Sequence, residues 1–112
     1  MKVSEYIKSG LKNYLENITS DYKLLGEAQE KIHKIRCFIK VEDNIITDVK
    51  FNSSKRCKKL MAIADLVCEK LKGQNLNQLS IDEKEILSFF EEEKDKDKLS
   101  ERLNLVKKAI LN

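Results

Sequence analysis

Residues 32–51 alternate polar and apolar side chains around a short acidic turn, and this pattern constrains the fold more than any other stretch. Successive side chains of a strand point to opposite faces, so the alternation predicts a β-hairpin with one buried face and a turn at residues 42–44. The side chains predicted to face inward are His33, Ile35, Cys37, Ile39, Val41, Ile45, Thr47, Val49 and Phe51.

An amphipathic helix is predicted after the hairpin, at about residues 55–72. Its start can be capped by Ser53 or Ser54, and Gly73 supplies a left-handed stop. Its apolar residues at helical spacing are Cys57, Leu60, Met61, Ala64, Val67, Cys68 and Leu71. Helix and hairpin each need an apolar partner, so we expect them to pack together.

The flanking sequence predicts further helices at about residues 3–16, 81–90 and 98–111. Ser80 and Glu83 form a predicted capping box, and residues 91–98 are a solvated charge run. Between the first helix and the hairpin, the sequence predicts only a turn at 17–21 and an interruption at Gly26. The whole is predicted to be one α+β domain over residues 1–112, a small antiparallel sheet packed on one face by helices.

Composition excludes several classes of protein. The chain has 22 Lys and Arg against 19 Asp and Glu, a net charge of +3, so a nucleic-acid partner is not expected. No apolar run approaches the roughly 18 residues of a membrane span, and the first residues show no secretory signal. Three widely spaced cysteines argue against a disulfide framework and favour the reducing cytoplasm.

Cys57 is the leading candidate for chemistry. It lies at a predicted helix start with Lys55, Arg56, Lys58 and Lys59 beside it. The helix dipole and nearby cations favour a thiolate over a thiol, and such surroundings can lower a cysteine pKa to roughly 3.5–7.5. The alternative is that Cys57 is only the first residue of the helix's apolar stripe, since free cysteine behaves as a small hydrophobe.

The other two cysteines and the sole histidine favour structural roles. Cys68 lies near the centre of the helical stripe, and Cys37 lies between Ile35 and Ile39 on the inward strand face, so both are predicted core residues. His33 shares that face, but four residues of strand span about 13 Å, too far for His33 and Cys37 to bind one ion.

From Ile35 onward the chain resembles the NifU/IscU-type iron–sulfur cluster assembly scaffolds, in particular the N-terminal NifU-like domain. The matching stretches are FIKVEDNIITDVKF (38–51), Cys57, EKLKGQNLNQLS (69–80), IDEKEIL (81–87) and LVKKAIL (105–111). The resemblance implies an IscU/SufE-like architecture, with a cluster held by three cysteines and an aspartate.

Most of these ligand positions carry other residues here. Counting along the matching stretches puts Lys31 at the first cysteine, His33 at the aspartate, Cys57 at the second cysteine, and Asp97 and Lys98 at the third. A [2Fe–2S] cluster needs four ligands, mostly thiolates, so a stable cluster is not expected. Cys57, His33 and Asp97 could instead hold iron or zinc at an open site.

Two functions follow from the resemblance to the scaffold family and from the replacement of most of its ligand residues. The first is a divergent scaffold-like protein that accepts sulfur or binds a metal through Cys57, with a cysteine desulfurase or another assembly component as its partner. The second is a non-catalytic interaction module that kept the fold, lost the cluster site and binds another protein. A nucleic-acid role through the patch 55–59 is disfavoured, because no aromatic residues are interleaved with its cations. In neither case is the chain expected to be an enzyme.

Overall fold

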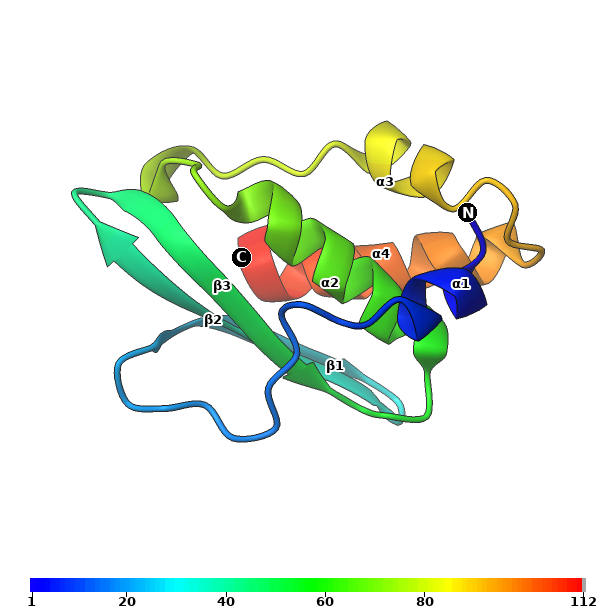
Figure 1. Cartoon of the computed structure of the whole chain (residues 1–112), viewed down its shortest axis with the longest axis horizontal. Helices are drawn as coiled ribbons and strands as arrows, with labels where there is room; N and C mark the ends of the chain where they lie inside the picture. Colours follow the sequence, from blue (N-terminus) through cyan, green and yellow to red (C-terminus); the bar gives the residue numbers. More distant parts are fainter. Residues whose placement is uncertain (112) are drawn as a thin grey trace.

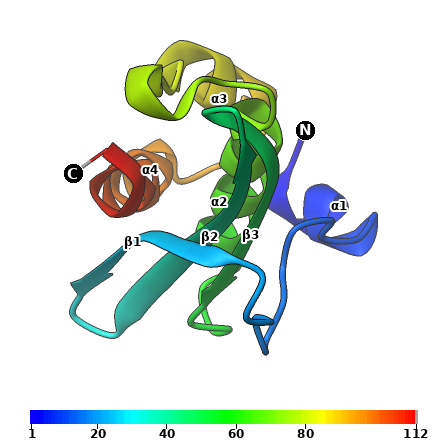
Figure 2. The same ribbon diagram turned by 90° about the vertical axis from the view of Figure 1, so that its left-hand side faces the viewer.

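The computed structural model, which describes residues 1–111, is a three-stranded antiparallel sheet with helices on one face (Figure 1). The α+β prediction is confirmed. The elements are α1 (Val3–Lys8), β1 (Lys23–Glu30), β2 (His33–Glu42), β3 (Ile45–Ser53), α2 (Lys58–Leu71), a 3-10 turn (Leu76–Gln78), α3 (Glu83–Phe89) and α4 (Lys96–Leu111). In Figure 2, α2 and α4 lie over the sheet and α3 lies beyond them. Within the described residues, no helix is both long and apolar enough to cross a membrane.

The predicted hairpin is present as β2 and β3. Its two turn residues, Asp43 and Asn44, have φ values of 52° and 65°, the left-handed conformation that a tight two-residue hairpin turn requires. Ile35, Cys37 and Ile39 are fully buried on the helix-covered face, as the alternation predicts.

Near the turn, the inward-facing and outward-facing positions of β3 are exchanged, which the sequence did not predict. The pairing between β2 and β3 shifts between Lys40 and Val41. As a result Ile46 is 1% exposed, whereas Ile45 is 39% exposed and Thr47 is also exposed. The prediction that Ile45 and Thr47 face inward is therefore wrong, because a bulge reverses the faces of every residue on one side of it.

Strand β1 is an element that the sequence did not predict. It pairs antiparallel with β2 and carries a bulge between Leu24 and Gly26. A Cβ atom built on Gly26 would lie 1.8 Å from the carbonyl oxygen of Ala109 in α4. Gly26 is thus a contact point between sheet and helix rather than an interruption, because only a glycine lets the two backbones approach so closely.

The first helix is much shorter than predicted. It ends at Lys8, and Gly10 follows with φ 101°, a conformation that a helix cannot continue. The chain then runs along the edge of β3, where Phe51 donates from its N–H to the Asn13 carbonyl (2.9 Å) and accepts from the Leu15 N–H (3.0 Å). Residues 9–16 therefore cover an open sheet edge instead of forming helix.

Helix α2 is the centre of the molecule. Its buried residues are Leu60, Met61, Ala62, Ile63, Ala64, Asp65, Leu66, Val67, Cys68 and Leu71. This is more than the single predicted stripe, because β3, α1, α3 and α4 all pack against the helix.

A buried carboxylate fixes the N-terminal segment to α2. Asp65 accepts hydrogen bonds from the Tyr6 hydroxyl (2.6 Å) and from the backbone N–H of Asn13 (2.8 Å). Burial, followed by the adjacent Asp65 carboxylate, raises the pKa of the Tyr6 hydroxyl. The phenol therefore stays protonated and can donate to the carboxylate.

Two capping predictions are corrected by the structure. Helix α2 begins after Cys57, whose Sγ accepts from the Leu60 N–H (3.4 Å), whereas Ser54 bonds to the backbone at the start of β2. Helix α3 is capped by Asp82, which accepts from the Glu85 N–H (3.1 Å), so the predicted pair of Ser80 and Glu83 is not the cap. The stop at Gly73 is confirmed, with φ 89°.

Candidate functional site

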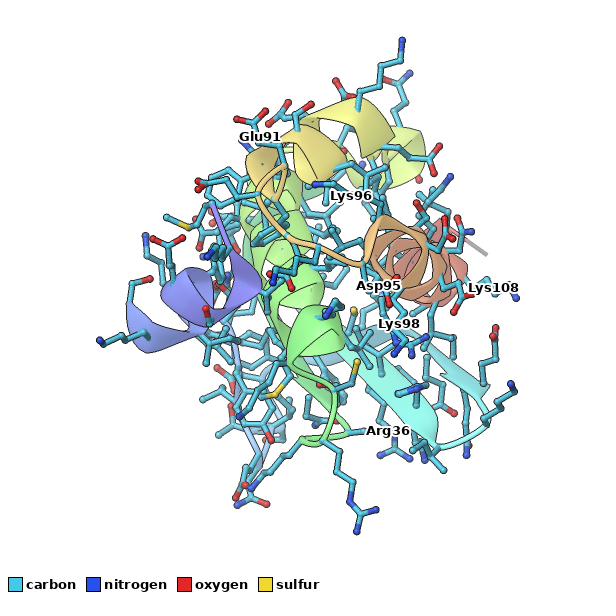
Figure 3. The ribbon with its side chains drawn as sticks, turned by 90° about the vertical axis from the view of Figure 1, so that its right-hand side faces the viewer. Arg36, Glu91, Asp95, Lys96, Lys98 and Lys108 are labelled. Atoms are coloured by element: carbon cyan, nitrogen blue, oxygen red, sulfur yellow. The ribbon has the colours of Figure 1, made fainter. Side chains whose placement is uncertain are left out.

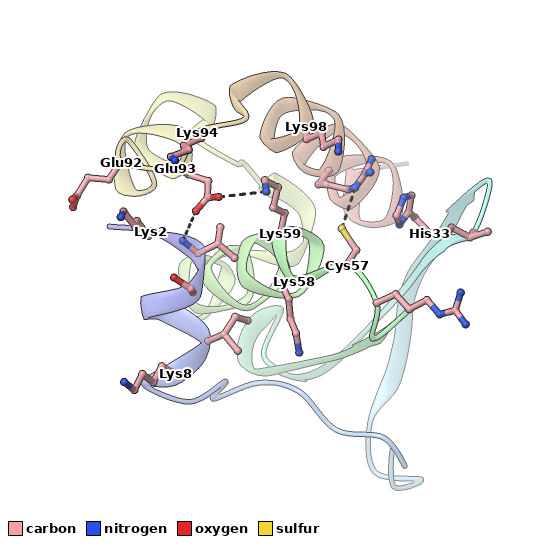
Figure 4. A pocket seen from close by; sticks show the side chains of 16 residues that line it. Lys2, Lys8, His33, Cys57, Lys58, Lys59, Glu92, Glu93, Lys94 and Lys98 are labelled. Atoms are coloured by element: carbon pink, nitrogen blue, oxygen red, sulfur yellow. Dashed lines mark hydrogen bonds and ion pairs between the residues drawn. The ribbon is translucent and has the colours of Figure 1, made fainter.

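An open cavity of about 840 Å³ lies at the end of the molecule where α2 begins (Figure 4). It is bounded by α1, the turn before β2, the start of α2, the loop after α3 and the first turns of α4. Figure 3 looks onto this end, with Lys98 near the start of α4. Segments from both ends of the chain therefore build the cavity together.

Cys57 lies half-buried in the cavity wall. Its Sγ accepts a hydrogen bond from Arg102 Nε at 3.2 Å and the capping bond from Leu60. The Arg102 side chain is only 13% exposed, and its other end contacts Glu101 at 3.5 Å. Hydrogen bonds from a guanidinium are among the strong ones and favour an ionised acceptor. The sulfur is thus held by one fixed cation and one backbone donor.

Arg102 is the site residue that the sequence analysis missed. It follows Leu99 by three residues and precedes Val106 by four, which places it at the border of the apolar stripe of α4. An arginine at such a border is often only a solvated flank of a helix. Its contact with Cys57 depends on the packing of α4 against α2, and no local pattern carries that information.

The cavity is strongly cationic. Two carboxylates line it, Glu92 and Glu93, and Lys59 lies 3.3 Å from Glu93. Its eight basic residues are Lys2, Lys8, Arg56, Lys58, Lys59, Lys94, Lys98 and Arg102. Three of the four basic neighbours predicted for Cys57 are thus present, but Lys55 lies outside this lining and pairs with Glu16. A concave surface lined by one sign of charge concentrates the field and favours anions.

His33 lines the same cavity as Cys57. Its Nδ1 is buried and has no hydrogen-bond partner among the described residues. Burial and the neighbouring positive charge of Arg102 lower the pKa of His33 below its ordinary value of 6.5. The imidazole is therefore mainly neutral at pH 7 and adds no positive charge to the cavity.

The structure does not bring the predicted metal ligands together. Cys57 and His33 line the cavity, and Lys98 lines it at the family's third cysteine position, but Asp97 is exposed and is not part of the lining. Lys31 lies exposed in the turn before β2. Across residues 1–111, no three His, Cys, Asp or Glu side chains are grouped so that they could hold a metal ion.

The donor set does not fit an iron–sulfur cluster. The cavity offers one thiol and one imidazole, and Lys98 brings an ammonium to the position where the resemblance to the scaffold family implies a thiolate. A cluster needs four ligands, and a cation at a ligand position repels the metal. Arg102 also donates to the one available sulfur. Binding of a sulfur-containing anion suits these residues better than ligation of a metal.

The other two cysteines have a different environment. Cys37 of β2 and Cys68 of α2 are both 0% exposed and lie next to each other in the core. Burial, and then the neighbouring Cys37, raises the pKa of the Cys68 thiol. Both predictions of a core role are confirmed, and these thiols are poor nucleophiles.

Comparison with known proteins agrees with this geometry. Two solved structures have the same fold, although sequence identity is low. One is the N-terminal part of a nitrogen-fixing NifU-like protein from Brucella abortus, with 12% identity, a TM-score of 0.63, and coverage of 96% of this chain and 85% of that one. The other is a putative iron–sulfur cluster assembly scaffold protein for the SUF system from Fervidobacterium islandicum AW-1, with 15% identity, a TM-score of 0.57, and coverage of 96% and 92%.

No curated protein sequence matches the chain. The model of the NifU-like N terminal domain family, however, matches residues 27–112, which span β1 to α4 and include Cys57, His33 and Arg102. The chain therefore belongs to the family of NifU-like N-terminal domains.

Proposed function

We propose that this protein accepts sulfur as a persulfide on Cys57 and acts in iron–sulfur cluster assembly as a non-catalytic, scaffold-like carrier. The observation that carries the proposal is the hydrogen bond from Arg102 Nε to Cys57 Sγ in a cation-lined cavity. Sulfur acceptance needs one nucleophilic thiolate, whereas cluster building needs several. The role printed for the Fervidobacterium neighbour, cluster assembly in the SUF system, is a context in which such a carrier is useful.

The transfer step balances without an external oxidant. The Cys57 thiolate attacks the terminal sulfur of a donor persulfide, and a new S–S bond forms on Cys57 as the S–S bond of the donor breaks. The donor leaves as a thiolate and the sulfane sulfur keeps its proton. Arg102 holds the attacking sulfur as an acceptor, and the cations around it stabilise the negative charge as it moves to the thiolate that leaves.

The direct test is to treat the purified protein with inorganic polysulfide and map persulfides by mass spectrometry. We expect one additional sulfur atom on the peptide that contains Cys57 and none on the peptides with Cys37 and Cys68, which serve as internal controls. Cys57→Ser should abolish the modification. Sulfur on Cys68 but not on Cys57 in the folded protein would refute the proposal.

Arg102 should act as a positioning residue in this step. We expect Arg102→Leu to slow persulfide formation at pH 7 by about tenfold, because a charge-assisted hydrogen bond to the sulfur is worth about 1.5–3 kcal/mol. Lys107→Leu, on the same helix but outside the cavity lining, is the matched control and should leave the rate unchanged. Arg102→Lys, which keeps a cationic donor at this position, should recover part of the rate if Arg102 positions the sulfur, whereas a purely structural loss would not be recovered.

The alternative function is an interaction module without sulfur chemistry. The specific observation in its favour is that a lysine, Lys98, lines the cavity at a family ligand position. Anaerobic reconstitution with iron and sulfide should yield no stable cluster under either function. The two differ in the reaction with polysulfide, since a pure interaction module leaves Cys57 unmodified.

A further inference from the structure

We propose that the cavity around Cys57 is a docking groove for an acidic protein segment that carries apolar side chains between its carboxylates. The inference rests on the proposed function in one respect, because the docked partner brings its sulfur to Cys57. It goes further by assigning the chemistry of the partner and the residues that recognise it.

The first argument is unpaired charge. Of the eight cations around the cavity, Lys59, Lys98 and Arg102 contact a carboxylate. The other five form no ion pair with any residue in the described part of the chain, and they are Lys2, Lys8, Arg56, Lys58 and Lys94. Like charges gathered around one concavity repel each other, and an acidic ligand removes this repulsion.

The second argument is the apolar part of the wall. Val3 and Ile7 present the inner side of α1 to the cavity, and Ile32 stands at the opposite rim with 69% of its surface exposed. Apolar side chains in the wall and at the rim of a charged groove can contact apolar side chains of a bound protein segment. An inorganic anion would use the cations but not these side chains.

The third argument distinguishes a protein from a nucleic acid. Among residues 1–111, no Phe, Tyr or Trp side chain lines the cavity, so these residues offer no stacking surface of the kind on which single-stranded nucleic acids bind. The net charge of the whole chain is only +3, which is less than a nucleic-acid-binding face requires. The combination suits a short acidic segment.

The groove also runs away from Cys57. Lys8 and Lys2 lie on or beside α1, and Lys94 belongs to the loop after α3, whereas Lys58 and Lys98 lie nearer the thiol (Figure 4). An extended segment can therefore contact cations along the groove while one of its residues reaches the sulfur. Such contacts raise the association rate and fix the register of the bound segment.

The test uses the full chain and a fluorescein-labelled peptide of glutamates with interspersed leucines. Fluorescence anisotropy should show binding that weakens with added salt, as screened charge contacts require. The groove variant Lys2→Glu, Lys8→Glu and Lys94→Glu should bind the peptide at least about tenfold more weakly. The matched control, Lys23→Glu, Lys34→Glu and Lys84→Glu, changes the net charge equally at exposed sites outside the cavity lining and should bind as the wild type does.

Equal binding by the groove and control variants would overturn the proposal, and so would tighter binding of a single-stranded RNA of the same charge. If the triple variant does not fold, Lys58→Glu alone at an exposed cavity position makes the same test. Failure of docking is distinguishable from failure of the proposed function. Peptide affinity reports only the groove, and the mass of the Cys57 peptide after polysulfide treatment reports only the sulfur step.

Discussion

The two ends of α2 place the same residue type in opposite surroundings. Cys68 lies in the middle of the core against Cys37, where burial holds the thiol protonated. Cys57 caps the start of the helix, half-buried, with Arg102 on its sulfur and a cationic cavity in front of it. Part of the difference comes from the helix itself, whose N-terminus favours an anion, and the rest comes from what the other elements bring to each end.

The largest expected effect is the difference in reactivity between these cysteines. Cys68 is fully buried and can react only after the fold opens, whereas Cys57 is reached through the cavity. With a stability of about 5–15 kcal/mol, opening of the core is rare, so iodoacetamide should modify Cys57 at least about 10³-fold faster. Peptide mapping over time measures both rates. Modification of both cysteines together, only upon denaturation, would make Cys57 a core residue.

The packing of α2 in the core can be tested by truncating its buried side chains. We expect Leu60→Ala or Leu71→Ala to reduce the free energy of unfolding by about 2–5 kcal/mol, because both side chains are fully buried. Urea titration followed by circular dichroism gives the value. Leu111→Ala, at a side chain that is 43% exposed, is the control and should change it by no more than about 0.5 kcal/mol. A loss below about 0.5 kcal/mol at both buried positions would contradict the packing of α2.

A smaller effect is expected where β1 meets α4. Gly26→Ala puts a methyl group against the Ala109 carbonyl, so the sheet and the helix must separate. Overpacking of this kind costs about 1–3 kcal/mol. Glu27→Ala, at the exposed neighbouring position, loses only a surface ion pair and should cost under about 1 kcal/mol. If Gly26→Ala were as stable as the wild type, the close approach of the two backbones would be wrong.

The smallest expected effect concerns the attachment of α1 to the cavity. The Glu93 carboxylate accepts from the Val3 N–H (2.8 Å) and contacts Lys59, and these partners, Val3 first, hold the pKa of Glu93 below its ordinary value of 4.5. A carboxyl group whose pKa is lowered by folding stabilises the protein at every pH above its unfolded-state pKa. That stabilisation is lost as the pH falls through the folded-state pKa. The free energy of unfolding of the wild type should therefore exceed that of Glu93→Gln by about 0.5–1 kcal/mol at pH 7, and this difference should become smaller below pH 4.5.

Urea titrations of both proteins between pH 3 and pH 7 measure this gap. Glu91→Gln, at an exposed position in the same charged run, is a suitable control because it removes a carboxylate without changing the contacts of Glu93 with Val3 and Lys59. If the difference in free energy of unfolding between wild type and Glu93→Gln stays constant from pH 3 to pH 7, the ionised Glu93 carboxylate does not stabilise the attachment of α1.

The same contrast explains which parts of the molecule could be predicted from sequence. The hairpin, α2 and the burial of Cys37 and Cys68 follow from apolar periodicity, which is a local property of the chain. The strand around Gly26 and the contact of Arg102 with Cys57 depend on residues far away in sequence. The bulge that turns Thr47 outward lies within the hairpin, next to backbone bonds that join Ile46 to Gly73 and Gln74. Cys57 itself could be singled out because its cationic neighbours are also its neighbours in the chain.

The residues that form the cavity lie far apart in sequence, and this determines when the site can form during synthesis. Val3 meets Glu93 across most of the chain, and Arg102 comes from α4, which is synthesised after every other wall of the cavity. A growing polypeptide can form the β2–β3 hairpin early, but the arginine that holds the Cys57 sulfur is added only later. During synthesis the thiol therefore lacks its guanidinium partner until α4 docks, so completion of the fold and formation of the contact between Arg102 and Cys57 coincide.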